Sequence, residues 1–179
     1  MENIKNDSRK TASPMRYLSA LIGFTAAVFL DQFTKYLAVI SLKDKPAFVL
    51  IDGVFELRYL ENRGAAFGIM QDMQYVFVIG AVIICAAVVV LYVRIPAAPR
   101  YIPLRICAVF LCAGAVGNVI DRIRLNYVVD FFYFRLIDFP IFNVADCYVV
   151  IVCITFVLLI LFYYRNEEDF SFLSRKERL

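Results

Sequence analysis

The chain has 179 residues, 62% of them hydrophobic, and a mean hydropathy of +0.72. Soluble domains are about 45–50% apolar, so this composition excludes an ordinary soluble enzyme and indicates several membrane spans. The net charge of +3 is too small to indicate nucleic-acid binding, and the absence of histidine excludes Ser-His-Asp and Cys-His catalytic units and an HExxH zinc site.

Four stretches are long and apolar enough to cross a bilayer, which takes roughly 20 mostly apolar residues. They leave no room for a separate soluble module, so we expect one mainly α-helical domain over residues 17–164, with tails at 1–16 and 165–179. The expected spans cover about residues 17–42, 74–93, 104–120 and 145–164.

The first span begins like a signal peptide, with a basic leader and an apolar run from Tyr17 to Leu30. The hydrophobic pattern continues past Asp31 to Leu42, so we expect an uncleaved span. The polar tail before Tyr17 is expected to be disordered.

Four spans put both termini on one side of the membrane. That side would carry eleven Lys and Arg residues and the opposite side seven. The positive-inside rule then predicts cytoplasmic termini, with the other span ends at the outer face.

The segment between the first two spans, about residues 46–69, is expected to form a small extracytoplasmic β-ribbon. Asp52-Gly53 separates two β-rich runs, which is a hairpin signal. Phe55, Leu57 and Tyr59 alternate with Glu56 and Arg58, which predicts one apolar and one polar face.

Polar residues interrupt the apolar chain near the predicted outer ends of the spans. Asp31 and Lys35 are spaced i, i+4, so they can pair on one helix face, either for packing or to support a polar site. Asn62 and Arg63 precede small residues, which fits either a tight turn or an amide that binds a peptide group.

The third span carries a second polar cluster. Gly114 and Gly117 would admit either a neighbouring helix or a substrate backbone. Asn118 and Arg122 share a helix face, and we expect Asp121 to pair with Arg122 or Arg124. Arg122 suits either a polar site or a snorkelling position at the interface.

Asp130 and Asp146 are the most informative polar residues, because carboxylates beside hydrocarbon are costly. Asn143 is expected to cap the fourth span, which puts Asp146 at the third helical position, where the helix dipole favours its charge. If the chain folds back, Asp130 and Asp146 can meet and share one proton, as an aspartic protease requires. Both would otherwise be interfacial residues, and Asp138 is expected to be a solvated loop residue.

Two other functional classes fit a hydrophobic chain of this size. Intramembrane charges also mark ion pathways, but here they gather at one face and the second and fourth spans are nearly free of charge. A structural subunit would leave the polar clusters unexplained. The five cysteines form no CxxC pair and are expected to be small hydrophobic residues inside helices.

The sequence resembles the bacterial lipoprotein signal peptidases (signal peptidase II) over about residues 20–165. The resemblance rests on four motifs in order: "DQFTK" from Asp31, "ENRGAAFG" from Glu61, "GAVGNVIDRIRLNYVVDFF" from Gly114 and "FNVADCYVV" from Phe142 to Val150.

The resemblance implies a multi-pass aspartic endopeptidase of the bacterial cytoplasmic (inner) membrane, with four spans, an extracytoplasmic β-cradle and an active site near the outer face. It implies that the substrate is a prolipoprotein cut just before a diacylglyceryl-modified cysteine, that globomycin inhibits the enzyme, and that no metal or other cofactor is needed. We expect membrane lipids around it, a monomer, and no nucleic-acid partner. By motif match, the catalytic pair is Asp130 and Asp146, the supporting pair is Asp31 and Lys35, and the residues that hold substrate are Asn62, Gly114, Asn118, Arg122, Asn143 and Ala145.

Overall fold

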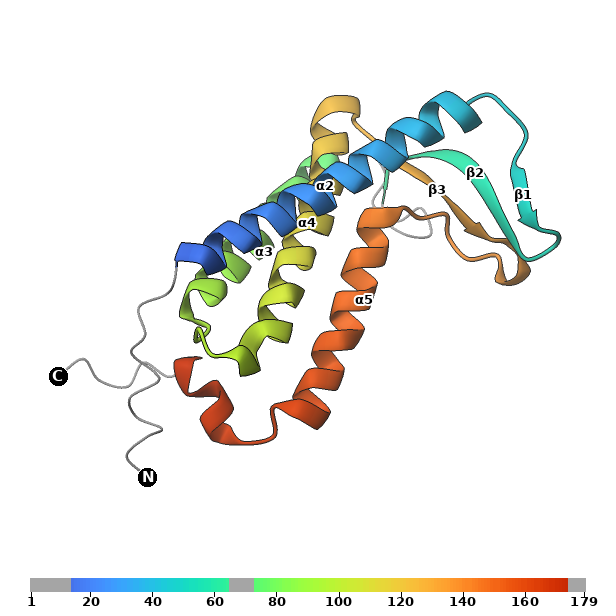
Figure 1. The fold of residues 1–179 in the computed structure, drawn as a ribbon. Coiled ribbons are helices and arrows are strands. Elements are labelled where there is room, and N and C mark those ends of the chain that lie inside the picture. Colours follow the sequence, from blue (N-terminus) through green and yellow to red (C-terminus); the bar gives the residue numbers. More distant parts are fainter. Residues whose placement is uncertain (1–13, 65–72, 174–179) are drawn as a thin grey trace.

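The structure is a computed structural model and describes residues 14–64 and 73–173 (Figure 1). Residues 1–13 of the polar N-terminal tail, which was expected to be disordered, lie outside the described residues, as does the end of the expected ribbon at 65–69. The expectation is wrong for the last residues of the tail, Pro14 to Arg16, which form the start of the first long helix. The long helices are α2 (Pro14–Leu42), α3 (Gln74–Arg94), α4 (Ile102–Leu125) and α5 (Val144–Leu158), and α5 continues as the π-helical turn η5 (Leu159–Tyr163).

All four helical segments are long and apolar enough to cross a membrane. Most of their large apolar side chains are exposed, and on α3 only Gln74 is buried. A helix that is apolar all round and uncovered by protein is stable only in lipid. The chain is therefore a multi-pass membrane protein, as its composition predicts.

The third helix extends past the apolar run on which its expected span was based. That run stops at Ile120, whereas the hydrogen-bonded helix continues to Leu125 and ends at Asn126, which has a left-handed backbone with φ of 62°. Asn tolerates this conformation and commonly ends helices. Because of the extra turn, Asp121 and Arg122 lie inside the helix, as the helix face expected for Asn118 and Arg122 requires.

A three-stranded antiparallel sheet lies at one end of the helices (Figure 1). Its strands are β1 (Phe48–Ile51), β2 (Phe55–Asn62) and β3 (Val128–Phe134), in the order β1-β2-β3. The hairpin predicted at Asp52-Gly53 is confirmed, with Gly53 at a φ of 68° that side chains disfavour. The sheet therefore combines a ribbon from between the first two spans with a third strand from before the fourth.

The register of the sheet brings two polar residues of the expected site together. Leu60 is paired with Asp130 and Asn62 with Val128, after an irregularity between Leu57 and Leu60. The expected alternation along β2 is wrong at Glu56, which is buried because Arg135 pairs with it at 2.8 Å.

A small apolar core fixes the sheet onto the first helix. It consists of buried Ala38, Leu42, Val129 and Phe131, with partly buried apolar residues packed around them. Val129 and Phe131 flank Asp130 in β3, so this core fixes the strand that carries Asp130. Asp138, in contrast, is exposed in the following loop, as expected, and accepts a hydrogen bond from the Tyr133 hydroxyl.

The end of the helices opposite the sheet is closed by short helical turns. These are η3 (Pro99–Tyr101), which leads into α4, and η6 (Glu167–Leu173), near the described end of the chain. Arg100 holds η6 through two hydrogen bonds to Asp169, at 2.8 and 2.9 Å. The start of α2 also lies at this end (Figure 1), as expected for four crossings.

Candidate active site

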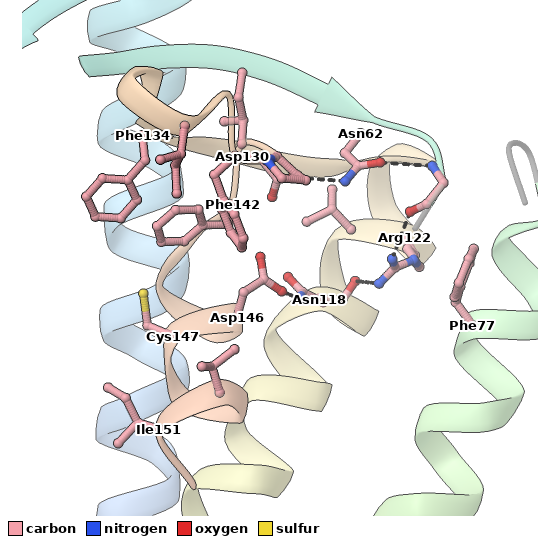
Figure 2. A pocket seen from close by; sticks show the side chains of 17 residues that line it. Asn62, Phe77, Asn118, Arg122, Asp130, Phe134, Phe142, Asp146, Cys147 and Ile151 are labelled. Atoms are coloured by element: carbon pink, nitrogen blue, oxygen red, sulfur yellow. Dashed lines mark hydrogen bonds between the residues drawn. The ribbon is translucent and has the colours of Figure 1, made fainter. Parts of the chain in front are cut away.

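Asp130 and Asp146 line the same cavity, which has a volume of about 650 Å³ (Figure 2). Asp130 comes from β3 and Asp146 from the first turn of α5. Asn62, Asn118 and Arg122 also line this cavity. Five of the residues singled out in the sequence, carried by four different elements, therefore face one space.

Asp130 is held by two amide groups while almost fully buried. Its exposed fraction is 1%. Nδ2 of Asn62 donates to its Oδ2 at 2.8 Å, and Nδ2 of Asn143 donates to its Oδ1 at 2.6 Å. Burial and the neighbouring negative charge of Asp146 raise the pKa of Asp130 to about 7, against the lowering effect of the two amides. The carboxyl group can thus hold a proton near neutral pH.

Asp146 is built into the start of α5. Its backbone N–H donates to Oδ1 of Asn143, and its Oδ2 accepts from the backbone N–H of Asn143, each at 3.1 Å. This reciprocal capping box confirms the predicted cap at Asn143 and the third helical position of Asp146. The helix N-terminus favours a negative charge at this position.

Asn62 forms the tight turn that its sequence context allowed, and its amide also contacts the Asp130 carboxyl group. Its Oδ1 accepts a hydrogen bond from the backbone N–H of Gly64 at 3.0 Å, as in a tight turn. The same side chain uses its Nδ2 to bind Asp130. The turn therefore fixes the amide orientation that contacts the carboxyl group.

A buried ionic cluster lies behind the cavity, between α2 and α4. Nζ of Lys35 lies 3.0 Å from Oδ2 of Asp31 and 3.0 Å from Oδ2 of Asp121. The expected i, i+4 pair is therefore present. The expected pairing of Asp121 with Arg122 or Arg124 is wrong, because α2 packs on the face of α4 that carries Asp121.

Gly114, Gly117 and Ala145 bring the helices close together and are not among the residues that line the cavity. A Cβ atom on Gly114 would lie 2.6 Å from the carbonyl oxygen of Ala145, and one on Gly117 would collide with the Asp31 carboxylate. The backbone N–H of Ala145 donates to Oδ1 of Asp31 at 2.9 Å. Of the two readings of these glycines, close packing of helices is the one that the contacts support.

Arg122 extends over the Phe77 ring, with 4.6 Å from its guanidinium carbon to the ring centroid (Figure 2). Its two hydrogen bonds, to the carbonyl oxygens of Asn118 and Gly64, are both long at 3.5 Å. Among the described residues, its buried Nε has no hydrogen-bond partner. The guanidinium group therefore keeps donor capacity at the cavity wall.

Most of the remaining cavity wall is apolar and was missed by sequence reasoning. It includes Phe134 from β3, a following segment through Phe142, and Val150 and Ile151 from α5. Apolar residues in a hydrophobic chain give no local signal, so only the fold reveals that these surround the two carboxyl groups. Within residues 14–64 and 73–173, no group of three or more Cys, Asp or Glu side chains has the arrangement of a metal site.

Comparisons with known proteins point to one family. The family model for signal peptidase (SPase) II matches residues 24–162. The lipoprotein signal peptidase of Streptococcus thermophilus is 39% identical over 160 residues, covering 89% of this chain and 97% of the relative. That of Caldanaerobacter subterraneus subsp. tengcongensis is 39% identical over 144 residues, covering 80% of this chain and 96% of the relative.

Two solved structures share the fold of this chain. A bacterial membrane enzyme determined by the in meso method at 2.3 Å resolution superposes with a TM-score of 0.73 at 31% sequence identity, covering 89% of this chain and 93% of that one. A second, at 1.9 Å resolution, gives a TM-score of 0.71 at 31% identity, covering 81% of this chain and 94% of that one. With the family model and the relatives, this shows that the chain belongs to the signal peptidase II family of bacterial membrane peptidases.

Proposed function

We propose that this chain removes signal peptides from prolipoproteins, with Asp130 and Asp146 as the catalytic pair. The observation that carries the proposal is that the two carboxyl groups line one cavity while sharing Asn143 as a hydrogen-bond partner. Two carboxyl groups in one partly water-excluded site favour a state with a single proton. That state provides one acid and one base for peptide hydrolysis.

Asp130 is proposed as the member that carries the proton before the reaction. Its raised pKa, caused by burial and by the charge of Asp146, supports this role. The protonated group can donate a hydrogen bond to the carbonyl oxygen of the scissile peptide. It thereby favours the tetrahedral intermediate that forms when water attacks.

Asp146 is proposed as the base. Its position in the first turn of α5 and its two N–H donors favour the carboxylate form. The carboxylate takes a proton from water as the water oxygen attacks the carbonyl carbon. When the C–N bond breaks, that proton is delivered to the leaving amine, which leaves a free carboxyl terminus on the signal peptide and a free amine on the lipoprotein.

The apolar cavity wall supports a lipidated substrate. Phe134, Phe139, Phe142 and Ile151 lie around the cavity that also contains the two aspartates. Acyl chains gain free energy from such a wall, at about 25 cal/mol per Å² of apolar surface buried. We therefore propose that the substrate cysteine carries a diacylglyceryl group and that the cut falls on its N-terminal side.

The polar residues around the pair are proposed to hold the substrate backbone. Arg122 has donor capacity to offer a peptide or ester carbonyl, and Asn62 and Asn118 lie beside the two carboxyl groups. Gly114 and Ala145 act from behind the cavity by allowing the close packing of α4 and α5, and Asn143 acts by holding the two aspartates. No metal or other cofactor has a part in the proposed reaction.

The proposed topology follows from the distribution of charge. Both termini would be cytoplasmic, with the sheet and the two aspartates near the outer face of the inner membrane. The substrate would enter from the bilayer with its signal helix beside the spans. We propose that the enzyme acts as a monomer among membrane lipids and that globomycin-type inhibitors occupy the cavity.

The experiment uses the purified full chain in detergent with a diacylglyceryl-modified prolipoprotein. The expected result is a gel shift, with mass spectrometry showing a new N-terminus at the lipidated cysteine. An identical precursor without the lipid is the matched control and should be cut poorly. Globomycin should block cleavage, and EDTA should leave it unchanged.

Two results would contradict the proposal. Equal cleavage of the unlipidated precursor would contradict the role given to the apolar wall. No cleavage by enzyme that still binds globomycin would contradict the substrate assignment.

A further inference from the structure

Lys35 is buried, and its ammonium group lies within 3.0 Å of three side chains. One of the three also contacts an aspartate of the active site. The exposed fraction of Lys35 is 3%. Its ammonium group is 3.0 Å from Asp31, 3.0 Å from Asp121 and 2.8 Å from Oδ1 of Asn118. An ammonium group has three N–H donors, so these acceptors account for all of them.

The contact with Lys35 determines which way the Asn118 amide faces. Oδ1 of Asn118 accepts from Lys35 and, at 3.0 Å, from Nδ2 of Asn143. The opposite orientation would put the NH₂ group of Asn118 against two donors, one of them charged. Nδ2 of Asn118 must therefore face the cavity, where it donates to Oδ1 of Asp146 at 2.8 Å.

The amide of Asn143 is fixed in the same way from its other side. Its Oδ1 is committed to the backbone N–H of Asp146, so its Nδ2 must point toward Asn118 and Asp130. Lys35 and the N-terminus of α5 thus fix both amides in a single arrangement. In that arrangement each aspartate accepts a hydrogen bond from a side-chain amide. Figure 2 shows the one that Asn118 donates to Asp146.

We infer that Lys35 is a positioning residue for catalysis, which acts through the Asn118 amide to orient Asp146. The inference rests on the proposed function and goes beyond charge neutralisation of Asp31 and Asp121. Lys35 is not among the residues that line the cavity. Its loss should therefore slow the chemical step and leave substrate binding nearly unchanged.

A purely structural role would predict something different. If Lys35 served only to neutralise Asp31 and Asp121, any neutral residue would suffice once one carboxylate was also removed. Asp121→Asn keeps the shape of the side chain, and its one oxygen can still accept from the N–H of Val129. The Gln32 amide, which donates to the other oxygen of Asp121, loses that acceptor equally in every variant made in this background. An Asp121→Asn background therefore separates the two roles.

The experiment compares two variants of the full chain in that background, Lys35→Gln and Lys35→Met. The side chains are similar in length and neutral, but only Gln can donate a hydrogen bond to Oδ1 of Asn118. We expect kcat of the Met variant to fall about 100-fold below that of the Asp121→Asn parent, with KM changed less than about threefold. The kcat of the Gln variant should be at least about tenfold higher than that of the Met variant.

Globomycin affinity and the thermal unfolding midpoint provide readouts that do not depend on turnover. Equal kcat values for the Gln and Met variants, with both folded and both binding globomycin, would overturn the inference. So would a loss confined to KM. Wild-type enzyme is assayed alongside, because its failure to cleave would count against the proposed function and not against the role of Lys35.

A second variant keeps Lys35 in place, so it remains informative if the Met variant does not fold. Asn118→Asp preserves the shape and the contact with the ammonium group, but it presents an acceptor to Asp146 instead of a donor. We expect it to fold and to lose about 100-fold in kcat. Wild-type kcat in this variant would overturn the inference.

Discussion

Asn143 connects the two aspartates through opposite parts of its own structure. Its side-chain Nδ2 lies 2.6 Å from Oδ1 of Asp130, and its backbone N lies 3.1 Å from Oδ2 of Asp146. The residue that caps α5 therefore also fixes the separation and orientation of the two carboxyl groups. Stability of the helix and geometry of the site depend on the same side chain.

These two roles of Asn143 can be separated by substitution. Ser is also a good N-cap residue but has no NH₂ group to reach Asp130, whereas Ala removes both functions. We predict that Asn143→Ser loses about 100-fold in kcat at nearly unchanged stability, and that Asn143→Ala additionally loses about 1 kcal/mol of unfolding free energy. Full activity of the Ser variant would contradict the bridging role.

The raised pKa of Asp130 predicts how activity depends on pH. If the reactive state has one proton on the pair, it is lost as pH rises through about 7. We predict that kcat/KM falls with a slope of one above that pH. A profile that stays flat to about pH 9 would contradict the assignment of the proton to Asp130.

The same pKa shift predicts a change of stability with the opposite sign from that of an ordinary ion-paired carboxylate. Between the ordinary value of 3.8 and about 7, the folded state binds more protons than the unfolded state. The contribution of Asp130 to stability is therefore complete below the lower value and is lost as pH rises through the upper one. We predict that the unfolding midpoint of wild type falls relative to that of Asp130→Asn between about pH 5 and pH 8.

Gly117 and Gly80 provide a matched test of helix packing. A Cβ atom at Gly117 would collide with the Asp31 carboxylate. A Cβ atom at Gly80 on α3 would have no neighbouring atom of the described residues within 4 Å. We predict that Gly117→Ala costs about 1–3 kcal/mol and moves α4 away from α2. Gly80→Ala should be neutral or slightly stabilising, and a similar effect of both changes would contradict the close approach.

Arg122 should act on binding more than on chemistry. Lys retains the charge but loses the planar group that stacks on Phe77 and presents several donors. We predict that Arg122→Lys raises KM about tenfold and lowers kcat by less than about threefold. A large loss of kcat at constant KM would instead indicate that Arg122 acts in the transition state.

Much of the fold could be predicted from local signals. Four apolar runs were sufficient for the helices, and the i, i+4 spacing of Asp31 and Lys35 was sufficient for their pairing. The cap at Asn143 followed from residue type and position alone. These features depend on residues that are close together in the sequence, so local patterns were enough to predict them.

Long-range features could not be predicted in the same way. β3 has no alternating pattern because its first four residues are all buried, including Asp130. The pairing of Asp121 with Lys35 depends on which face of α4 meets α2, which i, i+3 and i, i+4 spacing within α4 does not specify. The cavity wall combines residues from β3, α5 and the segment between them, so its apolar character became informative only once the elements were placed.

The central claim, that Asp130 and Asp146 are the catalytic pair, is tested most directly by Asp130→Asn and Asp146→Asn with the diacylglyceryl-modified precursor. Each change keeps the shape and removes one ionisable group. We predict that each lowers kcat by about 1000-fold or more while globomycin still binds and the protein stays folded. Cleavage within about tenfold of wild type by either variant would contradict the claim.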